Sequence, residues 1–333
     1  MYKNFYRFSF FCVVLSAVVA ITALVLPGYH ESVSVKKDGY IKWVDFNVTY
    51  SAMSNCLQYD LDSYGKKNHV SWIDLLAVIS ARGGGNFKNY KSSDLAKIIT
   101  QIEEGKTITE LSKELKYFEY YKEAYSAVLG GFVGEYEIER DDGTYEKKYG
   151  LKAFSPIAKG YSYSHFDDFG ASRSYGFRRK HLGHDMMGSV GTPIIAVESG
   201  YVECVGWNQY GGWRIGIRSF DKKRYYYYAH LRRDHPYNDM YEGKIVTAGD
   251  VIGYLGMTGY STKENVNNIN TPHLHWGMQL IFDESQKDAI AEIWIDLYAI
   301  TRLLEKNRSA VVRNDEVKEY YRKFEMFEPG FEK

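Results

Sequence analysis

The chain has 333 residues, of which 45% are hydrophobic and 25% are charged. This composition is typical of a globular protein of roughly two domains, and it excludes disorder as the main character of the chain. The 42 Lys and Arg residues balance the 42 Asp and Glu residues, so the positive field that attracts phosphates is absent and we expect no nucleic-acid partner. The three cysteines lack Cys-x-x-Cys spacing, so any metal would be held by histidine and carboxylate.

The first segment predicts export. Residues 8–26 carry no charge and follow Lys3 and Arg7. As a helix rising ~1.5 Å per residue, this run is long enough to cross ~30 Å of hydrocarbon, and the preceding basic residues favour a cytoplasmic start. We therefore expect a signal-anchor over residues 1–27, a single-pass protein of the cell membrane, and an extracytoplasmic remainder. A cleaved signal peptide is the alternative.

A helical pattern follows between residues 45 and 135. Apolar residues recur there at intervals of three and four, as on the buried faces of helices. Thr107 and Glu110 have the spacing of a capping box. The pattern predicts a small all-helical domain over 45–135. Its segment Ser80-Ala-Arg-Gly83 lacks the carboxyl group that glycosidic cleavage requires, so we expect a spacer or a module that binds an envelope protein.

Beyond residue 135 the sequence changes to short runs of β-branched and aromatic residues, broken by Gly, Asp and Asn. The length and spacing of these runs are typical of antiparallel strands. The runs lie at 194–197, 201–205, 213–217, 225–228 and 251–255. Apolar residues at helical intervals over 288–305 predict a closing C-terminal helix. The whole chain is therefore expected to be α+β, with an antiparallel β-sheet domain over 155–310 and a C-terminal tail over 311–333.

Histidine spacing indicates where the chemistry lies. In His181-Leu-Gly-His-Asp185, His181 and Asp185 are four residues apart and would point to the same side of an extended chain. Gly183 lies midway and would leave space for an ion. His184 would face the other way, so it is left out of the ligand set.

Two further elements supply histidines. His273 and His275 flank Leu274, so both imidazoles should project from one face of a strand. Tyr228-Ala-His-Leu231 places His230 at the end of an aromatic run. A lone histidine is usually a surface or hydrogen-bonded residue, but two same-face pairs and a fifth partner favour a metal site. Imidazole and carboxylate ligands suit zinc, and a catalytic zinc takes three protein ligands and keeps one open position.

The order of these motifs resembles a known family, the lysostaphin or LytM-type zinc endopeptidases. The segments that carry the resemblance are His181-Leu-Gly-His-Asp185, Gly191-Thr-Pro-Ile, Ala196-Val-Glu-Ser-Gly200, Tyr228-Ala-His-Leu231, Gly249-Asp-Val-Ile-Gly253, Gly256-Met-Thr-Gly259 and Pro272-His-Leu-His275. The match covers about 169–280. There are departures, because the loop over 261–272 is longer than usual and Trp276 stands where the family commonly has Phe.

The resemblance implies a LytM-type fold, the duplicated hybrid motif, with one zinc ion per chain held by His181, Asp185 and His275. It also implies that His273 and His230 lie beside the metal-activated water, and we favour His273 as the general base. The implied function is hydrolysis of peptide stems or cross-bridges in bacterial cell-wall peptidoglycan. The alternative is a membrane-anchored scaffold without hydrolytic activity that pairs with a partner envelope protein, as in sporulation-type relatives.

Overall fold

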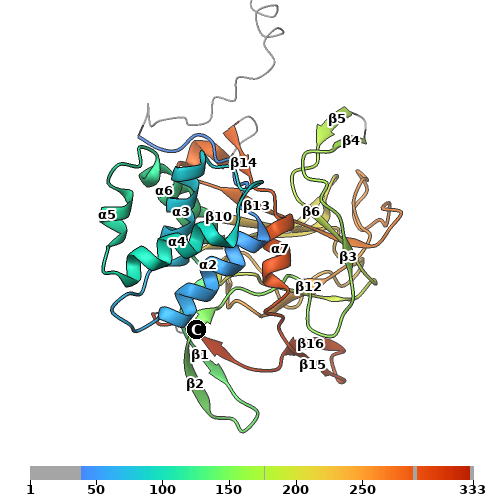
Figure 1. Cartoon of the computed structure of the whole chain (residues 1–333). Helices are drawn as coiled ribbons and strands as arrows, with labels where there is room; N and C mark the ends of the chain where they lie inside the picture. Colours follow the sequence, from blue (N-terminus) through green and yellow to red (C-terminus); the bar gives the residue numbers. More distant parts are fainter. Residues whose placement is uncertain (1–38, 176, 288–290, 331–333) are drawn as a thin grey trace, which may run out of the picture.

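The computed structural model describes residues 39–175, 177–287 and 291–330. Helices form the first part of this range and antiparallel strands most of the remainder (Figure 1), which confirms the expected mixture of helix and antiparallel sheet. The signal-anchor expected over residues 1–27 lies outside the described residues. Among the helices that are described, none combines the length and hydropathy needed to cross a membrane.

The N-terminal unit consists of helices, and side-chain caps fix the starts of α2, α3 and α5. Its helices are α2 (Tyr50–Ser63), α3 (Trp72–Gly83), α4 (Ser92–Glu103), α5 (Ile108–Ser112) and α6 (Phe118–Leu129). Thr49 accepts a hydrogen bond from the amide of Ala52 at the start of α2, and Thr107 and Glu110 form the predicted capping box before α5. Each cap satisfies amides that a helix start would otherwise leave without a partner.

The largest sheet is antiparallel and has the strand order β11-β8-β9-β10-β13-β6-β3, with β14 paired to β13. Its strands are β3 (Ser164–His165), β6 (His184–Met187), β8 (Gly200–Asn208), β9 (Gly212–Ser219), β10 (Arg224–Ala229), β11 (Ile245–Val246), β13 (His273–Leu280) and β14 (Ile293–Trp294). A second sheet pairs β7 (Pro193–Ile195) with β12 (Val251–Tyr254), and a hairpin pairs β4 (Ser172–Tyr175) with β5 (Phe177–Lys180).

Alternation along the central strands separates a buried face from a polar one. Leu274 and Trp276 on β13 are completely buried, as are Tyr226 and Tyr228 on the neighbouring strand β10. These side chains belong to one continuous hydrophobic cluster, which also includes residues of α2, α3 and α6. The helical unit and the main sheet therefore share a core, and burial of that core stabilises both.

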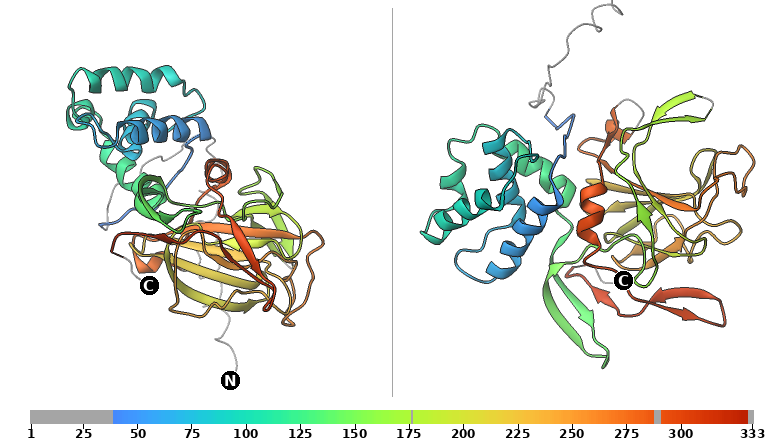
Figure 2. Two further views of the ribbon diagram at one scale, coloured as in Figure 1. Left: turned by 90° about the horizontal axis from the view of Figure 1, so that it is seen from below. Right: turned by 45° about the vertical axis from the view of Figure 1, so that its right-hand side comes forward.

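A buried ion pair joins the helical unit to the sheet. Arg224 on β10 donates to both carboxylate oxygens of Glu198, at 2.7 and 3.0 Å, and to the carbonyl oxygen of Ala127 near the end of α6, at 2.7 Å. Gly131 allows this approach, since a Cβ at that position would overlap the Glu198 carboxylate. The positive charge of Arg224 at the C-terminus of α6 also interacts favourably with the dipole of that helix. Helices and sheet lie side by side in the two views of Figure 2.

The C-terminal part departs from the expected helix over 288–305. Ile293 and Trp294 form β14, which extends the sheet beside β13, and the helix α7 (Tyr298–Leu304) begins only after it. The prediction of one long helix was wrong at its start. Ile293 and Leu297 are both buried, but Ile293 lies in strand β14 and Leu297 is the N-cap residue of α7, so the two do not lie on one helical face. Figure 2 shows α7 between the helical unit and the sheet.

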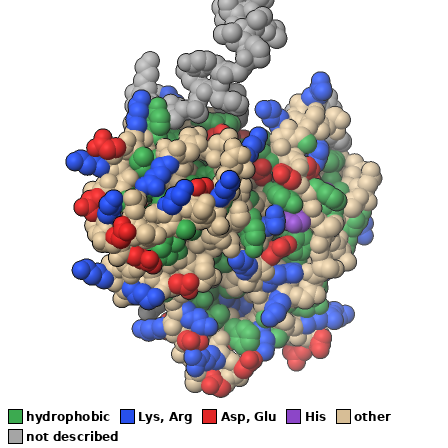
Figure 3. Space-filling view, viewed as in Figure 1, with side chains coloured by type: hydrophobic (Ala, Val, Ile, Leu, Met, Phe, Trp, Pro, Cys, Tyr) green, Lys and Arg blue, Asp and Glu red, His purple; other side chains and the backbone are tan. Residues whose placement is uncertain are grey.

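The expected tail over 311–333 folds in its described part. Strands β15 (Val311–Asn314) and β16 (Glu319–Arg322) form a hairpin. The last strand, β17 (Met326–Phe327), pairs with β1 (Val133–Glu139), which in turn pairs with β2 (Tyr145–Leu151). This segment therefore connects to the start of the β region. On the face shown in Figure 3, basic and acidic side chains are interspersed, in keeping with the balanced net charge.

Candidate metal centre

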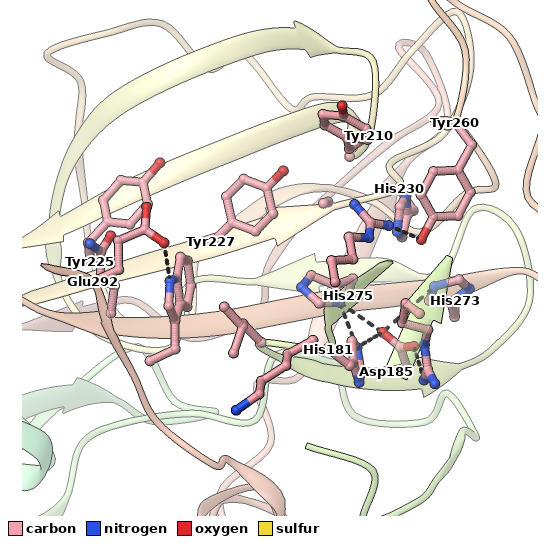
Figure 4. Close-up of a pocket in the computed structure, with 18 of the residues that line it drawn as sticks. His181, Asp185, Tyr210, Tyr225, Tyr227, His230, Tyr260, His273, His275 and Glu292 are labelled. Atoms are coloured by element: carbon pink, nitrogen blue, oxygen red, sulfur yellow. Dashed lines mark hydrogen bonds and ion pairs between the residues drawn. The ribbon is translucent and has the colours of Figure 1, made fainter. Parts of the chain in front are cut away.

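Three side chains that the sequence predicts as ligands converge. The His181 Nε2 and Asp185 Oδ1 atoms are 3.0 Å apart, Asp185 Oδ1 and His275 Nδ1 are 2.9 Å apart, and His181 Nε2 and His275 Nδ1 are 3.1 Å apart. Figure 4 shows these side chains pointing toward one another. They form a cluster that could hold a metal ion, each offering one ligand atom.

Strand register creates this convergence. His275 on β13 lies directly opposite Asp185 on β6 in the antiparallel ladder, so their side chains share one face. His181 comes from the segment between β5 and β6. Gly183 is required there, because a Cβ at that position would lie 2.4 Å from the Cε1 and Nε2 atoms of His275. The glycine that was predicted to leave space for an ion thus leaves space for the third ligand.

Outer contacts hold His181 in place. Its Nδ1 atom lies 3.2 Å from Asp168 Oδ1 and 3.4 Å from the carbonyl oxygen of the same residue. Arg173 donates to the Asp168 carboxylate and lies 3.7 Å from Asp185 Oδ2. A proton on Nδ1 directed at Asp168 leaves the Nε2 lone pair for a metal, which is the usual arrangement of a carboxylate, a histidine and an ion. The sequence pattern gave no signal for Asp168 or Arg173.

His230 and His273 lie beside the three ligands. The Nδ1 atom of His230 donates to the carbonyl oxygen of Thr258 at 2.9 Å, and that of His273 donates to the carbonyl oxygen of Thr271 at 2.8 Å. The two rings are in edge contact, with centroids 4.8 Å apart. His273 Nε2 is 3.8 Å from Asp185 Oδ1. An imidazole that carries its single proton on Nδ1 has an unprotonated Nε2, which can accept a proton.

Burial and the Asp185 carboxylate determine the protonation of the cluster. Burial acts to raise the pKa of Asp185, but hydrogen bonds from His181 and His275 outweigh it and hold that pKa well below its usual range. Burial lowers the pKa of His230 to about 3, assisted by the nearby His273 and His275. Burial also lowers the pKa of His275; burial acts in the same direction on His181, but the hydrogen bond to Asp185 and the charges of Asp185 and Asp168 outweigh it and raise the pKa of His181. Asp185 and His275 thus favour the ionised carboxylate and the neutral imidazole that bind a divalent metal, whereas His181 would release a proton on binding.

His184, which strand alternation places outside the ligand set, faces away from the ligands as predicted. Its Nε2 atom lies 2.8 Å from His165 Nδ1, and its ring contacts that of Tyr298 at the start of α7. Burial lowers the pKa of His184 to about 3, with a further contribution from His165. The pairing of His165 with His184 was missed because nothing in the local pattern around His165 indicates it.

The cluster opens into a groove of about 540 Å³. Alternate residues of β10 and β13 form its floor, as expected for strands whose other face is buried. Its walls include the aromatic residues Tyr210, Tyr260 and Trp294, and its far end includes Arg218 and Glu203. Figure 4 shows Tyr225, Tyr227 and Glu292 along the groove from the histidines. None of residues 261–272 lines the groove, so the long loop does not form its wall.

The donor set fits a zinc ion. Two imidazole nitrogens and one carboxylate oxygen are ligands that zinc accepts, and separations of 2.9 to 3.1 Å between them are close to the edges of a tetrahedron with ~2.0–2.1 Å metal–ligand bonds. The groove leaves the cluster accessible from one side, as a catalytic site requires. An acceptor such as Asp168 behind a ligating imidazole is also typical of metal sites.

The three candidate ligands lie in a part of the chain that is similar to known proteins. Residues 179–289 match the model of Peptidase family M23. Over 123 residues the chain is 41% identical to the L-Ala–D-Glu endopeptidase of Bacillus subtilis strain 168, a stretch that covers 37% of this chain and 36% of that protein. Over 97 residues it is 39% identical to lysostaphin of Staphylococcus simulans, covering 29% of this chain and 17% of that protein. The aligned part thus spans about a third or less of these relatives.

The fold is shared over a longer stretch. A crystal structure of a LytM protein from Ruminococcus gnavus superposes with a TM-score of 0.51 at 24% identity, covering 80% of this chain and 91% of that one. This likeness reaches well beyond residues 179–289 and concerns the fold alone. The matched family model and the identities to named endopeptidases show that residues 179–289 form a peptidase family M23 domain of the lysostaphin and LytM type.

Proposed function

We propose that this protein is a zinc-dependent endopeptidase that hydrolyses peptide stems or cross-bridges of bacterial peptidoglycan. The observation that carries the proposal is the cluster of His181, Asp185 and His275 with two more histidines beside it, in a groove open to solvent. The relatives aligned over this region are named as endopeptidases, one of them for cleavage between L-Ala and D-Glu.

Each residue has a role that its contacts support. His181, Asp185 and His275 would hold the ion, with His181 oriented by Asp168. When bound, zinc supplies Lewis acidity, which makes water a stronger acid and a peptide carbonyl a better electrophile. His273 would accept the proton of the attacking water. Its Nε2 lies 3.8 Å from Asp185 Oδ1, one of the three atoms that would bind the ion, and therefore close to where the water would be held.

His230 would act as the second histidine. Its backbone adopts φ 61°, an unfavourable conformation for a residue with a Cβ, and its ring is fixed by the hydrogen bond to Thr258. A fixed imidazole beside the reacting carbonyl can hydrogen-bond the developing oxyanion or the leaving amine. The strain at His230 fits a position held for function, where backbone strain is most often retained.

Export belongs to the same proposal. The uncharged run over 8–26 after Lys3 and Arg7 supports an N-terminal membrane anchor with the peptidase domain outside, where the cell wall lies. The helical unit, which shares a core with the sheet, would then hold the domain at a fixed orientation or contact an envelope protein.

The test combines metal analysis with digestion. The full chain, purified in detergent, should contain one zinc per chain by elemental analysis and should release peptides with new amino termini from purified sacculi, identified by mass spectrometry. A chelator should abolish release, and added zinc should restore it. Stoichiometric zinc without release from any stem type would contradict the hydrolase and favour the scaffold that lacks hydrolytic activity.

A further inference from the structure

One arginine in the groove has no acidic partner among the residues that the structure describes. Three arginines line the groove: Arg173, Arg179 and Arg218. Arg218 donates to both oxygens of Glu203, at 2.6 and 2.9 Å, and Arg173 donates to Asp168. Within the described residues, Arg179 is paired with no carboxylate, and its side chain is held by aromatic rings and a phenol instead.

The aromatic contacts fix the position of Arg179. Its guanidinium carbon lies 4.9 Å from the ring centroid of Tyr260 and 5.3 Å from that of Tyr210, and it donates a hydrogen bond to the Tyr260 hydroxyl. The ring faces contact the guanidinium without accepting a hydrogen bond in its plane, and only one hydroxyl does accept one. Most of the five N–H donors of Arg179 therefore remain available. This arrangement orients a cation without neutralising it.

The local backbone is built to bring these rings together. The amide of Tyr260 donates to the carbonyl oxygen of Tyr210 at 3.3 Å, which ties the β8–β9 turn to the loop after Gly259. Gly259 has φ 125°, and a Cβ there would lie 2.5 Å from the Tyr210 carbonyl oxygen and 3.0 Å from His230 Nδ1. Tyr260 itself adopts φ 47°. The same turn thus positions the platform for Arg179 and the catalytic His230.

Arg179 is also close to the proposed reaction site. The ring of Tyr260 has its centroid 5.8 Å from that of His230, and Figure 4 shows the two rings next to each other above the metal ligands. A group bound by Arg179 would therefore belong to a residue that flanks the bond to be cleaved. The planar fork of an arginine matches a carboxylate in two parallel hydrogen bonds.

We propose that Arg179 recognises a free carboxylate on the residue beside the scissile bond, so that the preferred substrate is an acidic stem peptide and not a neutral cross-bridge such as polyglycine. This inference rests on the proposed function and specifies its substrate class. In a peptide with L-Ala joined to the amino group of D-Glu and L-Lys joined to the γ-carboxyl of D-Glu, the α-carboxyl of D-Glu remains free next to the L-Ala–D-Glu bond. Arg179 would bind this group.

The test uses two peptides that differ in one group. The full zinc-loaded chain is assayed on L-Ala-γ-D-Glu-L-Lys and on the same peptide with the D-Glu α-carboxyl converted to an amide. We expect kcat/KM to be about 10- to 100-fold higher for the carboxylate. Arg179→Gln should bring the ratio of the two kcat/KM values close to one by lowering the value for the carboxylate peptide, and Arg179→Lys should restore part of the ratio.

The neighbouring arginine supplies a matched control. Arg178 lies next to Arg179 on β5 but is exposed and does not line the groove, so Arg178→Gln makes the same charge change and should leave the ratio unaltered.

Hydrolysis of both peptides at equal rates by the unaltered chain would overturn this inference but not the proposed hydrolase function. If neither peptide is cleaved, calorimetric binding to the His273→Ala protein decides. Tighter binding of the carboxylate peptide that depends on Arg179 supports the inference, and equal or absent binding overturns it.

Discussion

On one face of strand β13, His273 and His275 line the groove, whereas on the other face Leu274 and Trp276 are completely buried. The two faces alternate residue by residue, so the same backbone carries the candidate chemistry and part of the core. Substitutions on the groove face should change metal binding and hydrolysis with little effect on folding. Substitutions on the core face should lower stability with little effect on metal binding and hydrolysis.

The largest effect is expected for His275→Ala. The variant lacks one of three ligands, so we expect zinc content well below one per chain and a loss of hydrolysis of at least about 10³-fold, to the level of the chelated protein. Elemental analysis and sacculus digestion measure both. Its urea midpoint should match that of the unaltered chain in chelator. Zinc retained at full stoichiometry would show that His275 is not a ligand.

His273→Ala should lose hydrolysis and keep the metal. Removing a general base typically costs about 10²- to 10⁴-fold in kcat, and the ligand cluster does not include His273. Zinc content and kcat on a stem peptide separate the two effects. His235 is exposed and lies outside the groove, so His235→Ala is the control and should behave as the unaltered chain does. Equal loss of zinc in His273→Ala would assign this residue to the ligand set.

On the core face, Leu274→Ala should act on stability. Leu274 lies between the two histidines in sequence, and its side chain is fully buried on the opposite face of the strand. Truncation of such a leucine typically lowers the free energy of unfolding by about 2–5 kcal/mol. Urea denaturation of the zinc-loaded protein should show this loss, while kcat at 25 °C stays within about twofold of the unaltered chain. A large fall in kcat without loss of stability would show that the two faces are not separable.

The sequence predicts the parts of the site that depend on strand alternation. His273 and His275 share a face because they are two apart, and Asp185 meets His275 because adjacent antiparallel strands place opposed residues together. The family resemblance then selects which histidines are ligands. The capping box at Thr107 was predictable for a similar reason, since it depends on residues three apart.

Contacts between distant segments could not be predicted in this way. Arg179 reaches Tyr210 and Tyr260 only because one turn and one loop are joined by backbone hydrogen bonds. The start of the C-terminal helix was predicted wrongly because the spacing of Ile293 and Leu297 fits a helix, while pairing of β14 with the edge of β13 decides the structure. Local periodicity does not report such tertiary pairing.

The smallest predicted effect concerns Asp168, which contacts the ligand His181 from behind. Asp168→Asn keeps an oxygen acceptor but removes the charge that favours a proton on Nδ1 and a lone pair on Nε2. Loss of such an outer partner typically weakens metal binding by about 10- to 100-fold. Competition with a chromophoric chelator measures the affinity, and Asp167→Asn, at an exposed neighbouring position, is the control. An affinity equal to that of the control would mean that the Asp168 carbonyl oxygen, 3.4 Å from Nδ1, orients His181 by itself, and the groove face would then depend on backbone geometry more than on its outer charges.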